Sequence, residues 1–221
     1  MFLFIHDFLS RINTIKIFIF LTFLFAILNL KFKNKQHIFL LMVLIDCIAT
    51  EIISSVLKSI KINSIQLYSI SFIFHQALWI SLISWSINKK ELGKILVASF
   101  TTFGLINICF IEKSNLNYLT FISGALIYIV LFLFQSYRKL NEEELSYFTG
   151  NEYILLFAPV IFFFGLSFIF GFRNLQLLYI IIFGKTTLYT FIVYFANIVY
   201  YSLINLYIYR ERKLINRHHE H

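Results

Sequence analysis

Apolar runs long enough to cross a lipid bilayer follow one another along almost the whole chain. A helix needs about 20 mostly apolar residues to cross the hydrocarbon core of a bilayer. We therefore expect an all-α integral membrane bundle of about seven transmembrane helices. The expected spans, separated by short polar or charged connectors, are residues 14–30, 37–60, 66–87, 94–111, 118–136, 153–172 and 184–209.

The composition leaves no room for a separate soluble domain. Charged residues make up 14% of the chain and hydrophobic residues 59%, whereas a soluble domain has roughly 25% charged and 45–50% apolar residues. The formal net charge of +8 comes from basic residues scattered through short connectors, while a nucleic-acid-binding protein gathers such residues on one face. We expect the lipid bilayer, and no nucleic acid, as a partner.

The two ends of the chain differ from its membrane-spanning part, residues 14–209. Residues 1–13 place apolar side chains at roughly helical spacing around a few polar ones, which predicts a short amphipathic segment in the membrane interface. Residues 210–221 are expected to form a basic cytoplasmic tail. Residues 175–183 are apolar and continuous with the last span, so an interfacial segment and a long tilted helix both stay open for them.

The distribution of lysine and arginine predicts the orientation, because cytoplasmic loops have an excess of both. With the amino end outside, twelve basic residues fall on the inner side and six on the outer side. We therefore expect a multi-pass protein of the cell (inner) membrane with its amino end outside and its carboxyl end in the cytoplasm. The inner set is Lys31, Lys33, Lys35, Lys89, Lys90, Lys94, Arg138, Lys139, Arg210, Arg212, Lys213 and Arg217, and the outer set is Arg11, Lys16, Lys58, Lys61, Lys113 and Arg173.

Four ionisable residues, Asp46, Glu51, His75 and Lys185, lie inside expected spans. An ionisable group near the bilayer centre costs about 2.5–3.5 kcal/mol on insertion scales, so these residues are candidates for a functional site that faces the bundle interior. Glu51 and His75 each lie about nine residues from the outer end of their spans. That position puts them at the same depth and predicts that they pair. Asp46, about 140° further round the same helix, is expected to face a different neighbour.

Further polar residues concentrate the expected site toward the outer side. Gln76 follows His75, and Asn107 lies in the outer half of the fourth span. With Lys185 near the start of the seventh span, the set suits a ligand or proton site in a cavity open to the periplasmic or extracellular side. Hydrogen bonding between helices is the alternative for the buried groups, and snorkelling to the lipid headgroups is the alternative for Lys185.

One face of the seventh span is polar. Polar side chains recur there at spacings of four, three, four and four on an otherwise apolar helix, so this stripe is expected to point inward. It either hydrogen-bonds to neighbouring helices or lines a pathway for a solute. The stripe consists of Thr190, Tyr194, Asn197, Tyr201 and Asn205.

The sequence has no recognisable catalytic or metal-binding pattern. No serine or cysteine stands in a nucleophile setting, and no histidine and carboxylate cluster has the spacing of metal ligands. Cys47 and Cys109 fall inside expected spans without a spacing partner, so we interpret them as packing residues. We expect no catalytic residue, no metal and no cofactor.

Two segments of the last third, Asn151–Pro159 with Gly165 and Thr187–Tyr209 with Asn197 and Asn205, resemble small bacterial seven-span proteins of unassigned biochemistry. Proteins of that group are often encoded beside two-component signalling genes. The resemblance implies a membrane-embedded sensory or accessory component that lacks an output domain and works with a cytoplasmic or membrane signalling protein. It supplies no catalytic residue.

Three functions fit such a bundle. A non-enzymatic sensor or accessory signalling component is favoured by the expected outward pocket and the basic inner face. A small-solute or ion transporter is the second, because Asp46, Glu51, His75 and the polar stripe could form a relay. The single proline and seven glycines count against it, since transporters often have broken helices. An intramembrane lipid-acting enzyme is the third. The ligand and the oligomeric state stay open.

Overall fold

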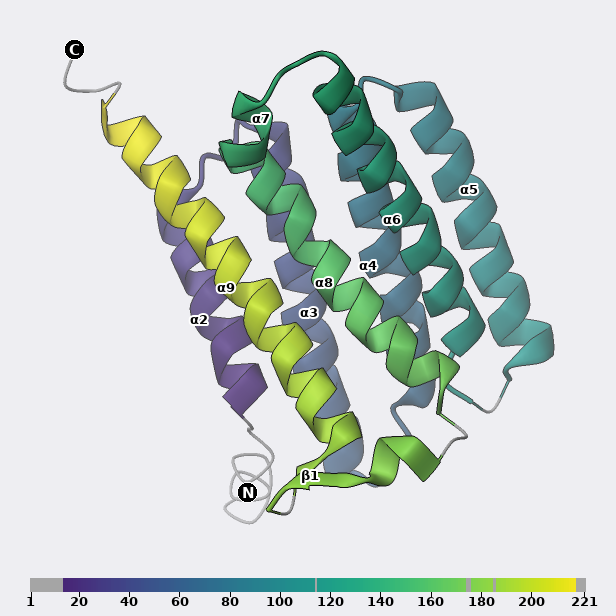
Figure 1. The fold of residues 1–221 in the computed structure, drawn as a ribbon. Coiled ribbons are helices and arrows are strands. Elements are labelled where there is room, and N and C mark those ends of the chain that lie inside the picture. Colours follow the sequence, from purple (N-terminus) through teal and green to yellow (C-terminus); the bar gives the residue numbers. More distant parts are fainter. Residues whose placement is uncertain (1–13, 114, 174–175, 185, 218–221) are drawn as a thin grey trace.

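The computed structural model describes residues 14–113, 115–173, 176–184 and 186–217. The expected interfacial segment 1–13, Lys185 and residues 218–221 of the expected tail lie outside the described residues. Helices dominate the described chain (Figure 1). The α-helices are α2 (Thr14–Asn29), α3 (Lys35–Ser59), α4 (Ile65–Ser86), α5 (Lys90–Ile106), α6 (Tyr118–Asn141), α7 (Ser146–Thr149), α8 (Asn151–Gly171) and α9 (Leu188–Arg217).

The expected all-α membrane bundle is confirmed by six helices that are long and apolar enough to cross a membrane. These are α3, α4, α5 with its π-helical extension η1 (Asn107–Ile111), α6, α8 and α9. Helix α2 is also apolar but has 16 residues, which gives it a length of about 24 Å at ~1.5 Å per residue. That length is less than the ~30 Å of a typical hydrocarbon core.

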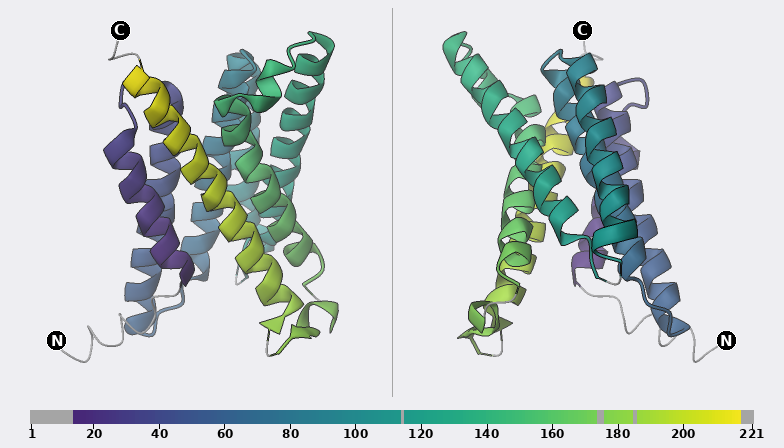
Figure 2. Two further views of the ribbon diagram at one scale, coloured as in Figure 1. Left: turned by 60° about the vertical axis from the view of Figure 1, so that its left-hand side comes forward. Right: turned by 90° about the vertical axis from the view of Figure 1, so that its right-hand side faces the viewer.

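Six helices close a ring around the centre of the bundle. In ring order they are α2, α3, α4, α6, α8 and α9, where each packs against the next and α9 packs against α2. Helix α5 lies outside the ring, mainly against α4 (Figure 1). Figure 2 shows that α9 crosses the bundle obliquely and runs in the same direction as α2. Helix α2 therefore closes the ring between α3 and α9.

The apolar segment before the last span forms a turn and a hairpin. A 3-10 turn, η2 (Gln176–Tyr179), leads into strand β1 (Ile181–Phe183), which pairs antiparallel with β2 (Thr186–Thr187). Gly184 has a φ of +55°, a left-handed conformation that glycine adopts without steric cost. The last span therefore begins at Leu188 and not at the expected residue 184. We call this end of the bundle the hairpin end and the opposite end, where α9 finishes, the tail end.

A close approach of α4 and α6 sets the shape of the ring interior. The side-chain amide nitrogen of Gln76, Nε2, donates to the Phe121 carbonyl oxygen at 2.8 Å. A Cβ atom placed on Gly124 would clash with the Gln76 side chain and would lie 2.6 Å from a ring carbon of Phe100. The absence of a side chain at Gly124 thus allows α6 to contact both α4 and α5.

Candidate functional site

A cavity of about 230 Å³ lies inside the helix ring, in the half of the bundle near the hairpin end. All six ring helices contribute to its walls. We call it the central cavity. Its hydroxyl, amide and ionisable lining residues are Lys16, Thr50, Glu51, Tyr68, Ser71, His75, Asn197 and Tyr201. Four residues predicted from the sequence, Glu51, His75, Asn197 and Tyr201, are therefore brought together here.

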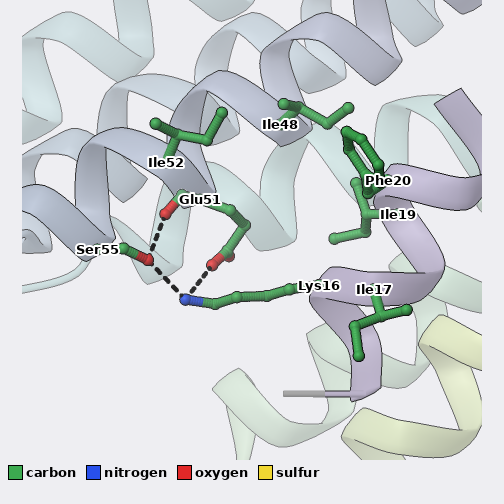
Figure 3. A pocket seen from close by; sticks show the side chains of 8 residues that line it. All are labelled: Lys16, Ile17, Ile19, Phe20, Ile48, Glu51, Ile52 and Ser55. Carbon is green, nitrogen blue, oxygen red and sulfur yellow. Dashed lines mark hydrogen bonds and ion pairs between the residues drawn. The ribbon is translucent and has the colours of Figure 1, made fainter. Parts of the chain in front are cut away.

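An ion pair between α2 and α3 forms one wall of the cavity. Lys16 Nζ lies 3.2 Å from Glu51 Oε2 and donates to Ser55 Oγ at 2.9 Å. Figure 3 shows the Lys16 side chain reaching from α2 to these two α3 residues. On the other side, the Tyr68 hydroxyl of α4 donates to Glu51 Oε1 at 3.2 Å. Glu51 thus connects α2, α3 and α4.

The structure pairs His75 with Asp46 and not with Glu51. His75 Nδ1 lies 3.8 Å from Asp46 Oδ2, which also accepts a hydrogen bond from Ser71 Oγ at 2.9 Å. The expected pairing assumed that the ends of α3 and α4 are level. Glu51, eight residues before the end of α3, instead lies opposite Tyr68, three residues after the start of α4. Helix α3 therefore extends further toward the hairpin end than α4 does. This stagger places Asp46, and not Glu51, beside His75.

The neighbours of His75 favour one tautomer of its neutral ring. The indole N–H of Trp79 donates to His75 Nε2 at 3.2 Å, which makes this nitrogen the acceptor. The ring proton then lies on Nδ1, which faces Asp46 and also lies 3.6 Å from Cys47 Sγ. Cys47, interpreted from the sequence as a packing residue, thus contacts the central histidine.

The central cavity is closed toward the tail end by an aromatic layer. Trp79, Tyr128, Phe163 and Tyr200 are fully buried there. The Trp79 ring centroid lies 6.2 Å from that of Tyr128 and 6.1 Å from that of Tyr200, and Tyr128 lies 5.3 Å from Phe163. Trp79 Nε1 also donates to the Tyr200 hydroxyl at 3.1 Å. We call these four residues the aromatic floor.

Gln76 and Asn107, two predicted site residues, lie outside the cavity lining. Gln76 is fully buried and joins α4 to α6 through Phe121. Asn107 is fully buried in η1, where its Nδ2 donates to Glu112 Oε2 at 2.8 Å and Thr120 Oγ1 at 3.1 Å and also contacts Asn117 Oδ1. These four residues form an outer polar cluster, in the sequence order Asn107, Glu112, Asn117 and Thr120. Sequence reasoning missed its last three members.

The polar stripe of α9 is divided among three surroundings. Asn197 and Tyr201 line the cavity, whereas Asn205 Nδ2 donates to Thr22 Oγ1 of α2 at 2.8 Å. The Thr190 hydroxyl lies 2.9 Å from that of Thr187, and Tyr194 is 36% exposed. The middle of the stripe therefore points inward as expected, and its Tyr194 end does not.

Comparisons of the chain with family models, with curated proteins and with solved structures find no match. The resemblance to small bacterial seven-span proteins therefore stays a prediction. The functional argument below rests on the geometry of the cavity and of α9.

Proposed function

We propose that the protein is a non-enzymatic sensor or accessory signalling component of a bacterial inner membrane. A ligand binds in the central cavity, in the outer half of the bundle. Helix α9 then transmits the bound state to a signalling protein at the cytoplasmic face. In this proposal α2 is a seventh span, the hairpin end is outside and the tail end is in the cytoplasm.

The placement of basic residues supports this orientation. At the tail end, Lys33 lies in the α2–α3 connector, Lys90 begins α5 and Lys139 lies in the last turn of α6, and the tail itself is also basic. Fewer basic residues, such as Lys61 and Lys113, lie in the connectors at the hairpin end. Because cytoplasmic loops have the excess of lysine and arginine, the tail end is assigned to the cytoplasm.

The observation that best supports signalling is the path of α9. This helix has 30 residues, about 45 Å at ~1.5 Å per residue, and is longer than the ~30 Å hydrocarbon core. It lines the cavity with Asn197 and Tyr201 and ends in the exposed basic residues Arg212 and Lys213. One rigid element therefore touches both the cavity and the cytoplasmic face.

Contacts near the tail end join α9 to α3 and α8. Glu211 of α9 lies 3.3 Å from His37 Nε2 of α3 and accepts a hydrogen bond from Asn151 Nδ2 of α8 at 2.6 Å. A shift of α9 caused at the cavity would change these contacts. Such a shift requires a ligand that binds two positions of α9 with different affinity.

A cavity inside a helix ring also fits the second candidate, a small-solute transporter. Transport requires a route from the cavity to the opposite face of the membrane. The aromatic floor of Trp79, Tyr128, Phe163 and Tyr200 fills the ring interior along that route. The sensor is therefore the better-supported function.

The proposal is tested by purifying the protein from native membranes in mild detergent and identifying co-purifying proteins by mass spectrometry. We expect stoichiometric recovery of a signalling protein. A variant with Arg212→Gln and Lys213→Gln should lose it, while a matched variant with Lys58→Gln and Lys61→Gln at the opposite end should retain it. A partner-free wild-type protein, with an unrelated seven-span protein as the background, would contradict the sensor function.

A further inference from the structure

A second, apolar cavity of about 360 Å³ lies on the outer surface of the seam between α2 and α3 (Figure 3). We call it the lateral groove. Ile17, Phe20 and Ile52 line it and are about half exposed. Exposed apolar side chains of a membrane-spanning bundle face lipid tails. We therefore infer that the groove opens toward the bilayer.

The lateral groove and the central cavity adjoin. Lys16, Ile19 and Glu51 line both of them. The Lys16–Glu51 ion pair, with 18% and 26% of its side chains exposed, thus stands between the bilayer side and the ring interior. Both side chains are long, so rotation about their own bonds can open this connection without a movement of α2. The combined volume of the two cavities falls within the range of about 300–1,000 Å³ that is typical of ligand sites.

The charges around the central cavity favour an uncharged ligand head. Lys16 and Glu51 already neutralise each other, and His75 lies against the carboxylate of Asp46. A charged head would find no free counter-charge in the Lys16–Glu51 pair, and an unpaired charge in an apolar cavity is unfavourable.

The shape and chemistry of the walls favour a planar head with acceptor oxygens. Phe72, Phe121 and Phe162 line the cavity together with Tyr68 and Tyr201, and aromatic rings pack well against another flat ring. The Tyr201 hydroxyl and the Asn197 amide, one of whose two N–H groups donates to the Val193 carbonyl oxygen, provide hydrogen-bond donors at the cavity wall. Such donors suit carbonyl oxygens.

We propose that the ligand is an isoprenoid quinone of the membrane, with its ring in the central cavity and its tail in the lateral groove. This inference rests on the proposed sensor function and names the ligand class of the same site. The quinone has no net charge, a flat ring, carbonyl acceptors and a single apolar tail. It enters from the bilayer at the α2–α3 seam, past Lys16 and Glu51.

The test uses the full-length protein in detergent and the fluorescence of Trp79. The chain has two tryptophans, so Trp85→Phe leaves Trp79 alone, one hydrogen bond away from His75 of the cavity wall. Quinones quench tryptophan fluorescence at short range. A quinone with a short isoprenoid tail should therefore quench Trp79 in a saturable way.

A matched pair of substitutions tests the position of the tail. Ile52 lines the lateral groove and is 50% exposed, whereas its neighbour Ile53 is 45% exposed and lies outside both cavity linings. Ile52→Phe should weaken quinone binding about 10-fold, the effect of a mismatched methylene-sized group in an apolar pocket. Ile53→Phe should leave binding unchanged, and both variants should show the wild-type melting temperature.

Three results would overturn the quinone assignment. These are unsaturable quenching of Trp79, equal binding by the Ile52→Phe and Ile53→Phe variants, and displacement of the quinone by an equal concentration of a saturated fatty acid carboxylate. The quinone assignment and the sensor function can fail separately. Recovery of a signalling protein without quinone binding would support the sensor function and contradict the quinone assignment. Quinone binding without a co-purified partner would support the quinone assignment and contradict the sensor function.

Discussion

The indole N–H of Trp79 lies 3.2 Å from His75 Nε2 and 3.1 Å from the Tyr200 hydroxyl oxygen. One donor therefore joins the histidine of the central cavity to α9 through the aromatic floor. A proton on His75 Nε2 would place two N–H groups against each other and expel the Trp79 hydrogen bond. We therefore expect a change at His75, whether by proton or by ligand, to alter the hydrogen bond that Trp79 donates to Tyr200 on α9.

Replacing Trp79 by phenylalanine should destabilise the protein more than the same change at Trp85. Trp79→Phe keeps an aromatic ring but leaves the buried acceptors on His75 and Tyr200 without their donor, which costs about 1–3 kcal/mol. The measurement is reversible unfolding in mixed micelles. Trp85 makes no hydrogen bond through its indole within the described residues, so Trp85→Phe should stay within about 0.5 kcal/mol of wild type. Equal losses in both variants would contradict this role of Trp79.

A double-mutant cycle should separate the observed ion pair from the one expected from the sequence. Lys16→Met and Glu51→Gln should couple by about 0.5–1 kcal/mol, because the pair is close but partly exposed. Glu51→Gln and His75→Gln should be additive within about 0.5 kcal/mol. The free energies of unfolding of the single and double variants give both values. A larger coupling of Glu51 to His75 than to Lys16 would contradict the structure.

This pair also shows what the sequence could and could not predict. Hydropathy located the six long spans, because a membrane helix requires a long apolar run. Depth along a span gave the approximate height of Glu51 and His75 but neither the stagger of α3 against α4 nor the direction of each side chain. Both of these depend on packing between helices, and in the structure they place His75 beside Asp46 and Lys16 beside Glu51.

The outer polar cluster was missed for a different reason. Glu112 and Asn117 lie in a short connector, where the sequence predicts solvated residues, yet the structure buries both of them. The available signal was the spacing of Asn107, Glu112 and Asn117 over one short stretch. In the structure Asn107 begins the π-helical turn η1 and its side chain reaches Thr120 of α6, where these side chains meet.

Removal of Asn107 should destabilise this cluster. Asn107→Ala leaves Glu112 and Asn117 buried without a shared donor, and an unsatisfied buried polar group costs about 1–3 kcal/mol. Thermal unfolding in detergent measures the loss. Asn115, which is exposed in the same connector, provides the matched control, and Asn115→Ala should change stability by less than about 0.5 kcal/mol. Similar stability of the two variants would show that the cluster contributes little.

A methyl group at Gly124 should push α6 away from α4. Gly124→Ala places a Cβ against the Gln76 side chain and 2.6 Å from a Phe100 ring carbon, and such overpacking costs about 1–3 kcal/mol. At Gly171 the corresponding Cβ has nothing within 4 Å, so Gly171→Ala should be neutral within about 0.5 kcal/mol. Unfolding free energies of the two variants decide the point. A neutral Gly124→Ala would mean that the two helices can separate freely.

Thiol labelling should establish the orientation on which the outward cavity depends. Lys113 and Lys33 are exposed residues in connectors at the hairpin end and the tail end, respectively. With the hairpin end outside, Lys113→Cys should react with a membrane-impermeant reagent on intact spheroplasts. Lys33→Cys should react only after the membrane is permeabilised. The parent chain, in which Cys47 and Cys109 lie within helices, measures the background.

The opposite labelling pattern would show that the protein has the inverted orientation in the membrane. The central cavity and Lys16 would then lie in the inner half of the bilayer, and the basic end of α9 would project to the outside. That orientation would reverse the lysine and arginine bias and would leave a cytoplasmic partner facing the cavity end of the ring, so signal transfer along α9 would no longer be required. The proposed mechanism therefore requires that Lys113→Cys is labelled on intact spheroplasts.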